Sequence, residues 1–132
     1  MKIAAITDDR MTISQHFGRA SYYVVVNVED GKIVDRQLRD KIGHVQFHEE
    51  AHAADPPGQP HGFSPAAHDR HILMAESIAD CEALLCRGMG AGAYNSMLQR
   101  GIRPVVTDIV AIDEAVLAYA RGRIVDHTEL LH

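Results

Sequence analysis

The chain has 132 residues, of which 46% are hydrophobic and 23% are charged, and its formal net charge is −5 at pH 7. This length suits one domain with a buried core, and the composition is that of a globular protein. The acidic balance argues against nucleic acid or an acidic membrane surface as partners. No apolar run approaches the roughly 20 residues that a membrane span needs, so we expect a single domain over 1–132.

The two cysteines, Cys81 and Cys86, fit a reducing compartment. Their spacing differs from the CxxC pattern of redox and zinc sites. The N-terminus soon meets two aspartates and indicates a first strand, not a signal peptide. We therefore expect free thiols and a cytoplasmic protein.

The N-terminal part predicts a strand, a loop and a hairpin. Residues 3–7 form a short apolar run typical of a buried strand, and the polar stretch 8–20 predicts a loop. Residues 22–28 are rich in β-branched and aromatic side chains, which favour a strand. An Asp-Gly pair at 30–31 provides the positive φ of a tight turn, so 33–38 is predicted to return as the antiparallel partner.

The C-terminal part alternates helices and strands after an irregular insertion. Residues 40–67 hold prolines, glycines and histidines without apolar periodicity, and an insertion of this kind is usually functional or mobile. The predicted elements that follow are helical spacing over 72–79, a strand at 82–86, a helix at 93–100, a strand at 103–107 and a helix at 112–120. Because such alternation implies right-handed parallel crossovers, we expect an α/β fold with a mixed sheet covered by helices.

A glycine loop follows the predicted strand at 82–86. Its sequence over 87–93 is RGMGAGA, which places Gly88, Gly90 and Gly92 before a helix. Glycines let the backbone approach a ligand, and a helix N-terminus presents free N–H groups, a combination that favours an anion. A tight strand-to-helix turn without a ligand is the alternative.

The same loop also matches a dinucleotide fingerprint. Gly88, Gly90 and Ala93 have its spacing, and Asp108 lies near the end of the next predicted strand, where a ribose-binding acid would sit. A full dinucleotide fold needs more βα units than remain in this chain. A phosphate- or nucleotide-binding regulator using residues 88–93 therefore stays open as a second class of function.

A histidine motif precedes the second predicted strand. Residues 14–20 read SQHFGRA and contain His16, Gly18 and Arg19. Imidazole suits softer transition metals, and a guanidinium offers a fork of donors to an anion. An ordinary surface loop is the alternative. Since this loop and the glycine loop both follow strand ends, we expect His16 and Gly90 to border one pocket.

Several segments occur together in an order that resembles a known family. They are HFGRA at 16–20, DGK at 30–32, CRGMGAGAY at 86–94, and the later stretches RGIRPVVT and DEAVLAYARG. The chain resembles the dinitrogenase iron–molybdenum cofactor biosynthesis family, which includes NifX, NafY and the C-terminal part of NifB. The resemblance implies a ribonuclease-H-like three-layer fold with a mixed, roughly five-stranded sheet. It also implies a non-enzymatic carrier of an iron–molybdenum or related iron–sulfur cluster, with donor and acceptor proteins as partners.

The resemblance further implies a site built from both motifs. His16 matches the histidine of the family's HFG motif and Cys86 a cysteine common before the glycine loop, so both are implied metal ligands. Arg87 stands where the family usually has glycine, and a bulky cation there could either narrow the pocket or help to neutralise an anionic cluster. The implied cofactor-binding residues are His16, Phe17, Gly18, Arg19, Cys86, Gly88, Gly90 and Gly92.

The fold name raises the question of nuclease activity. A nuclease needs several carboxylates that converge on metal ions. The order of Asp8, Asp9, Asp80, Asp108 and Asp113 shows no such signature. We therefore expect no nuclease activity, and the resemblance implies a protein that is not an enzyme.

Histidines concentrate in the insertion. The chain has nine, and His44, His48 and His52 are four residues apart. On a helix these three would share one face, where a pair can bind zinc, nickel or copper, with further histidines between 61 and 71 to complete a site. A solvated insertion with unliganded histidines is the alternative. A divalent-metal binder is thus a third class of function.

Overall fold

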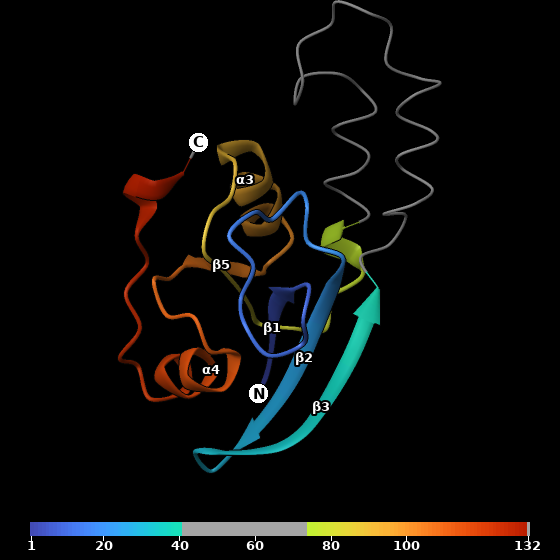
Figure 1. The fold of residues 1–132 in the computed structure, drawn as a ribbon, viewed down its shortest axis with the longest axis vertical. Coiled ribbons are helices and arrows are strands. Elements are labelled where there is room, and N and C mark those ends of the chain that lie inside the picture. Colours follow the sequence, from blue (N-terminus) through green and yellow to red (C-terminus); the bar gives the residue numbers. More distant parts are fainter. Residues whose placement is uncertain (41–73, 132) are drawn as a thin grey trace, which may run out of the picture.

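The computed structural model describes residues 1–40 and 74–131, which form one mixed sheet flanked by helices (Figure 1). The strands are β1 (Lys2–Thr7), β2 (Tyr22–Glu29), β3 (Lys32–Asp40), β4 (Ala83–Cys86) and β5 (Arg103–Val106). The helices are α3 (Ala91–Gln99), α4 (Ile112–Ala120), the 3-10 helix η1 (Thr128–Leu130) and the helical residues 74–76.

The described part of the chain has a five-stranded sheet in the order β3-β2-β1-β4-β5. β1 pairs antiparallel with β2 and parallel with β4, while β5 adds to β4 in parallel. Figure 1 shows α3 on one side of β5 and α4 on the other, so the sheet lies between helical layers. These features confirm the predicted α/β class, a ribonuclease-H-like three-layer fold with an N-terminal hairpin.

The hairpin of β2 and β3 forms where the Asp-Gly pair predicts it. Asp30 has φ 53° and Gly31 has φ 75°, the left-handed backbone that a two-residue turn requires. The strands then pair antiparallel from Glu29 opposite Lys32 outward, with a bulge after Asn27. β3 extends beyond the predicted 33–38 at both ends, because pairing with the long β2 continues past the apolar residues.

The core lies around the two central strands. Ile3 to Ile6 in β1 and all of β4 are fully buried, which explains why both segments are continuous apolar runs instead of alternating ones. α4 begins and ends where the sequence predicts it. The helical spacing over 72–79 is misleading, because the helix ends at residue 76 and turns follow to residue 80. There Ser77 donates its hydroxyl to the Met74 carbonyl (2.7 Å), a local bond that competes with helix continuation.

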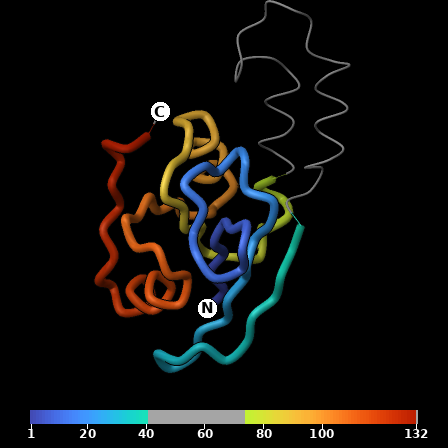
Figure 2. Tube along the Cα trace, viewed as in Figure 1, coloured from blue at the N-terminus to red at the C-terminus, as the bar shows by residue number. Residues whose placement is uncertain are grey.

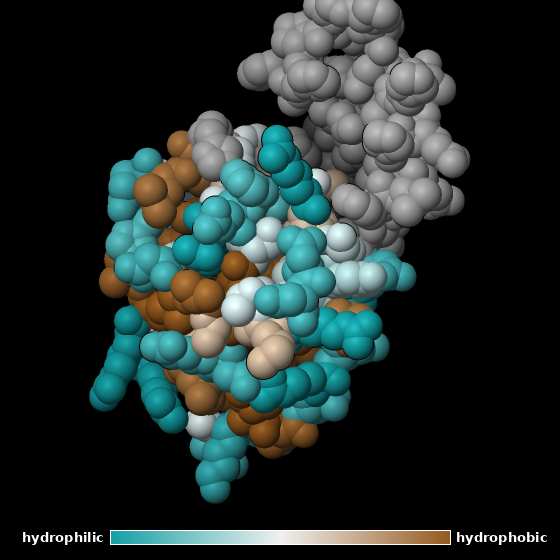
Figure 3. Space-filling model, in the orientation of Figure 1, coloured by the Kyte–Doolittle hydropathy of each residue, from teal (hydrophilic) through white to brown (hydrophobic). Residues whose placement is uncertain are grey.

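The surface of the described residues is mixed. On the face shown in Figure 3, hydrophilic side chains surround separate apolar patches. The most exposed of the large hydrophobic residues is Met11, at 75%, in the loop after β1. Within residues 1–40 and 74–131, every helix is too short or too polar to span a bilayer.

A carboxylate organises the loop that follows β1. Asp9 accepts hydrogen bonds from the Thr12 N–H (2.7 Å), the Thr12 hydroxyl (2.7 Å) and the Met11 N–H (2.9 Å). These bonds, those from Thr12 first, hold the pKa of Asp9 well below its usual range. Asp80 is similar: the hydrogen bond from Arg39 and then that from Lys2 lower its pKa.

Acid should therefore weaken the fold. A lowered native pKa means that each carboxylate stabilises the folded state above its unfolded pKa of 3.8, and that this stabilisation is lost as pH falls. We expect the free energy of unfolding in urea to drop between about pH 5 and pH 3. An Asp9→Asn, Asp80→Asn double variant should show a shallower drop, and equal slopes for both proteins would contradict the assignment.

Candidate functional site

Two loops at the carboxyl edge of the parallel strands lie against each other. The loop after β1, residues 8–21, meets the glycine loop after β4 through two backbone hydrogen bonds. Phe17 N–H donates to the Gly88 carbonyl (3.0 Å), and Arg87 N–H donates to the Ser14 carbonyl (3.2 Å). Figure 2 shows the blue loop beside the yellow segment that leads into α3. The structure thus joins the two motifs that the sequence predicts to share a site.

Buried side chains and hydrogen bonds hold the loop after β1 in place. Its interior side chains, Ile13 and Phe17, are 1% and 4% exposed. Ile13 N–H donates to the Val110 carbonyl (2.8 Å). Ser21 N–H donates to the Asp8 carboxylate (2.9 Å), which links the last residue of the loop to its first. Residues on its outer side are therefore held in place although they are exposed.

His16 is one of these outer residues. Its carbonyl accepts the N–H groups of Arg19 (3.2 Å) and Ala20 (3.1 Å), and its own N–H donates to the Ser14 hydroxyl (3.3 Å). The backbone of the motif is thus a tight turn. Among the described residues, the His16 imidazole has no hydrogen-bond or ion-pair partner, and the side chain is exposed. A ligand can reach the ring without displacing a neighbour in this part of the chain.

The glycine loop ends at the N-terminus of α3. Gly90 is the N-cap residue, with no side-chain cap hydrogen bond, and the first turn holds no acidic residue. The first N–H groups of α3 therefore have no capping side chain and carry the positive end of the helix dipole. The predicted start at residue 93 is wrong, because α3 begins at Ala91. Gly92 consequently lies in the first turn of the helix and not in the loop.

Burial divides the predicted cofactor-binding residues. The exposed ones are His16, Gly18, Arg19 and Gly92; Gly90 is half-buried; Phe17, Cys86 and Gly88 are buried. Phe17 packs against the ring of Tyr23, with centroids 6.5 Å apart, so it anchors the loop from below. The order of residues within the two motifs therefore does not show which side chains are exposed and which are buried.

Cys86 faces the interior. It is 0% exposed, and its thiol lies 3.7 Å from the Val105 carbonyl. Burial, and then the charge of Asp126, raises the pKa of Cys86 to about 12. Both cysteines are free, in agreement with the expected reduced state. As a metal ligand Cys86 would have to leave the core and lose its proton, so its ligand role stays a prediction.

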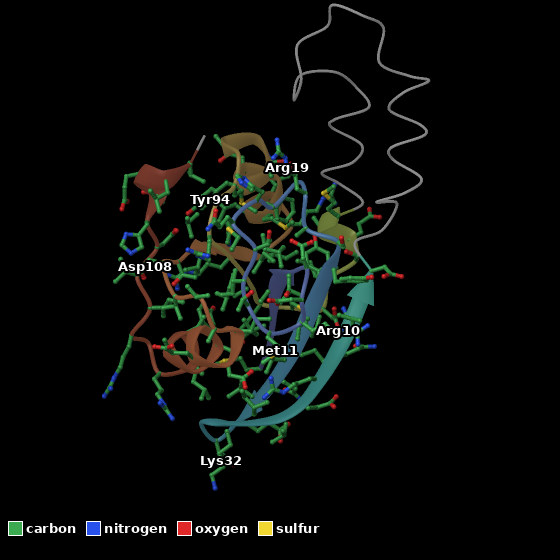
Figure 4. All side chains as sticks on the ribbon, viewed as in Figure 1. Arg10, Met11, Arg19, Lys32, Tyr94 and Asp108 are labelled. Atoms are coloured by element: carbon green, nitrogen blue, oxygen red, sulfur yellow. The ribbon has the colours of Figure 1, made fainter. Side chains whose placement is uncertain are left out.

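Cationic side chains flank the junction of the loops. Arg19 is exposed and lies two residues after Phe17, and Arg87, whose own N–H joins the loops, is half-buried. In Figure 4, Arg19 lies near α3, whereas Arg10 and Met11 lie at the other end of the loop. The carboxylates of Asp8 and Asp9 accept hydrogen bonds from backbone N–H groups of the same loop. Guanidinium groups and the N–H groups of a helix N-terminus are donors that suit an anion.

Other predicted features are separate from this junction. A depression of about 280 Å³ lies at the amino ends of β4 and β5, between Glu82, Arg103 and Tyr119. Neither His16 nor Gly90 lines this depression, so the pocket that we expect them to share stays a prediction. Residues 1–40 and 74–131 contain no group of three or more His, Cys, Asp or Glu placed to hold a metal ion. The histidines at positions 44, 48 and 52, and those between 61 and 71, lie outside the described residues.

One connection escaped sequence reasoning. Asp126, in the C-terminal segment, accepts hydrogen bonds from the Tyr94 hydroxyl of α3 (2.7 Å) and from the Val106 N–H of β5 (2.9 Å). The only local signal is an isolated acid after the last predicted helix, which does not indicate a partner.

The fold and the joined loops define a class: a small mixed-sheet α/β domain with an exposed histidine turn beside a glycine loop that opens a helix. The profile of the family described as dinitrogenase iron-molybdenum cofactor matches residues 1–122. The chain belongs to this family, as its motifs suggest. Membership connects it with the biosynthesis of that cofactor.

Solved structures share the fold across nearly the whole chain. The apo orange protein from Desulfovibrio gigas is 19% identical, with a TM-score of 0.64 over 96% of this chain and 92% of that one. A candidate dinitrogenase from Methanocaldococcus jannaschii is 12% identical, with a TM-score of 0.60 over 97% and 95%. A candidate NifB protein from Thermotoga is 17% identical, with a TM-score of 0.60 over 96% and 93%. A comparison with curated proteins finds no match.

Proposed function

We propose that this chain binds and carries an anionic iron–molybdenum cluster, or a related iron–sulfur or molybdenum–sulfur precursor, during metallocofactor biosynthesis. The observation that carries the proposal is the Phe17 N–H to Gly88 carbonyl bond, which seats the histidine turn on the glycine loop. Membership of the iron–molybdenum cofactor family supports the choice of cargo.

Each part of the junction has a chemical task in this proposal. The exposed His16 imidazole supplies a nitrogen ligand to a soft or borderline metal. The N–H groups of the first turn of α3, with Arg19 and Arg87, stabilise the negative charge of the cluster's sulfides. Because the Cys86 thiol is buried and protonated, the proposal gives the main ligand role to His16.

A carrier role without catalysis agrees with how the acids are used. Asp8 bonds Ser21, Asp9 bonds Thr12, and Asp80 and Asp113 pair with arginines of β3. These carboxylates serve separate local contacts and do not converge on one point. As a carrier, the chain needs a donor and an acceptor protein, and its free thiols suit the reducing cytoplasm.

The exposed position of His16 suits cargo that must be passed on. A ligand on the surface of a tight turn leaves most of a bound cluster open to an acceptor. A fully enclosed site would require the carrier to open first, which adds a slow conformational step.

Anaerobic reconstitution tests the proposal. The purified chain is incubated with iron, sulfide and tetrathiomolybdate, separated from small molecules, and analysed for metals and visible absorption. We expect a chromophore with iron or molybdenum to co-elute with the protein. A colourless, metal-free protein would contradict the proposal. Release of a nucleotide on denaturation would instead support the phosphate-binding alternative at the glycine loop.

A further inference from the structure

The C-terminal segment, residues 123–131, lies beyond the part of the chain that matches the family, yet it contacts the edge of the sheet. β5 is an edge strand, and the outward N–H and C=O of Val106 would otherwise be unpaired. Val106 N–H donates to the Asp126 carboxylate (2.9 Å), and His127 N–H donates to the Val106 carbonyl (2.7 Å). The segment therefore closes this edge at its carboxyl end.

The same carboxylate reaches the helix that opens at the glycine loop. The Tyr94 hydroxyl donates to the second oxygen of Asp126 (2.7 Å). Tyr94 lies in the first turn of α3, and its N–H makes the bond to the Gly90 carbonyl (3.1 Å) that starts the helix. Figure 4 shows Tyr94 between α3 and the C-terminal segment. One side chain thus ties the end of β5 to the start of α3.

The start of α3 needs such support. The helix has nine residues, no side-chain cap, and glycine both at its cap and in its first turn. An isolated helix of this length is unstable, and glycine makes its ordering entropically costly. The buried residues of α3 are Ala93 and Met97, of which only Ala93 lies in the first turn. Within the described residues, the Tyr94 hydroxyl makes a polar contact that links this turn, through the Asp126 carboxylate, to β5.

We propose that Asp126 is a positioning residue and that residues 123–131 form a clasp, which holds the first turn of α3 against β5 and so sets the glycine loop for its ligand. The effect on ligand rests on the proposed function. The clasp itself exists in the ligand-free chain and is tested there.

Amide hydrogen exchange of the full chain without ligand tests the clasp. Tyr94→Phe removes only the hydroxyl, and we expect the hydrogen-bonded amides of α3, from the Tyr94 N–H that donates to the Gly90 carbonyl (3.1 Å) onward, to exchange roughly tenfold faster, since the lost bond is to a charged acceptor. Asp126→Ala should also speed exchange of the Val106 amide. The matched control is Tyr119→Phe, which removes the hydroxyl bond to Glu82 (3.2 Å) at the other end of the sheet and should leave α3 unchanged. Equal α3 exchange in Tyr94→Phe and wild type would overturn the clasp.

Binding of tetrathiomolybdate tests the positioning role. We expect Tyr94→Phe and Asp126→Ala to bind it several-fold more weakly and to alter its induced visible circular dichroism, which depends on the geometry around the chromophore. Asp126→Asn keeps an oxygen acceptor and should recover part of both signals. Faster exchange with unchanged affinity and dichroism would overturn the positioning role. A wild-type protein that binds no cluster or tetrathiomolybdate would count against the proposed function, whereas the exchange result would still decide the clasp.

Discussion

The His16→Ala variant is expected to bind its cluster at least about tenfold more weakly than wild type. Removing even a residue that only hydrogen-bonds a metal ligand lowers metal affinity about 10–100-fold. The imidazole is exposed and has no partner among the described residues, so its removal should leave the fold intact. Titration with tetrathiomolybdate, followed by visible absorption, measures the affinity, and far-ultraviolet circular dichroism measures the fold.

Gln15→Ala is the matched control. Gln15 is the preceding residue, is also exposed, and lies in the same loop. Its truncation removes a polar side chain without touching the proposed ligand, so affinity should stay at the wild-type value. Equal affinity of all three proteins would remove His16 from the site. Equal weakening by both substitutions would show that the loop surface matters and not the imidazole.

The Phe17→Ala variant is expected to lose about 3–5 kcal/mol of unfolding free energy, the usual cost of emptying a buried phenylalanine site. The side chain is 4% exposed and packs against Tyr23 beneath the loop. Its own N–H bonds Gly88, so a collapse at this position should also separate the two loops. Urea denaturation measures the stability, and tetrathiomolybdate titration at a temperature where the variant is folded measures binding.

Phe17→Leu serves as the control for this prediction. It keeps an apolar side chain under the loop, so most of the stability and of the binding should remain. A loss below about 0.5 kcal/mol in Phe17→Ala would be that of an ordinary surface substitution and would contradict the anchoring role. If a destabilised Phe17→Ala protein bound tetrathiomolybdate as well as wild type, the packing of Phe17 beneath the loop would not control binding.

These two variants separate the proposed ligand from its support. His16 should affect affinity without stability, because the ring is on the surface. Phe17 should affect both affinity and stability, because its buried side chain packs under the loop and holds it in place. The opposite burial of neighbouring residues in one motif follows from the tight turn, in which the His16 carbonyl accepts two N–H groups while Phe17 points inward.

Local signals in the sequence determined most of the elements. The Asp30-Gly31 pair predicts the hairpin because the backbone of its turn suits few other residues. The apolar run in β1 predicts a strand that is buried on both faces, and the apolar spacing of residues 112–120 predicts α4. The two motifs also predicted the family and the pair of loops. All of these depend on residues close together in the chain.

Only the tertiary structure decided how the site is assembled. The bonds from Phe17 to Gly88 and from Tyr94 to Asp126 join residues far apart in the chain, and no periodicity encodes such partners. The burial of Cys86 also depends on β5 packing beside β4. Local propensity selects the conformation of a segment, whereas exposure and pairing arise when distant segments pack together. The motif could therefore name His16, Phe17 and Cys86 as one set, and only packing separates the exposed ring from the two buried side chains.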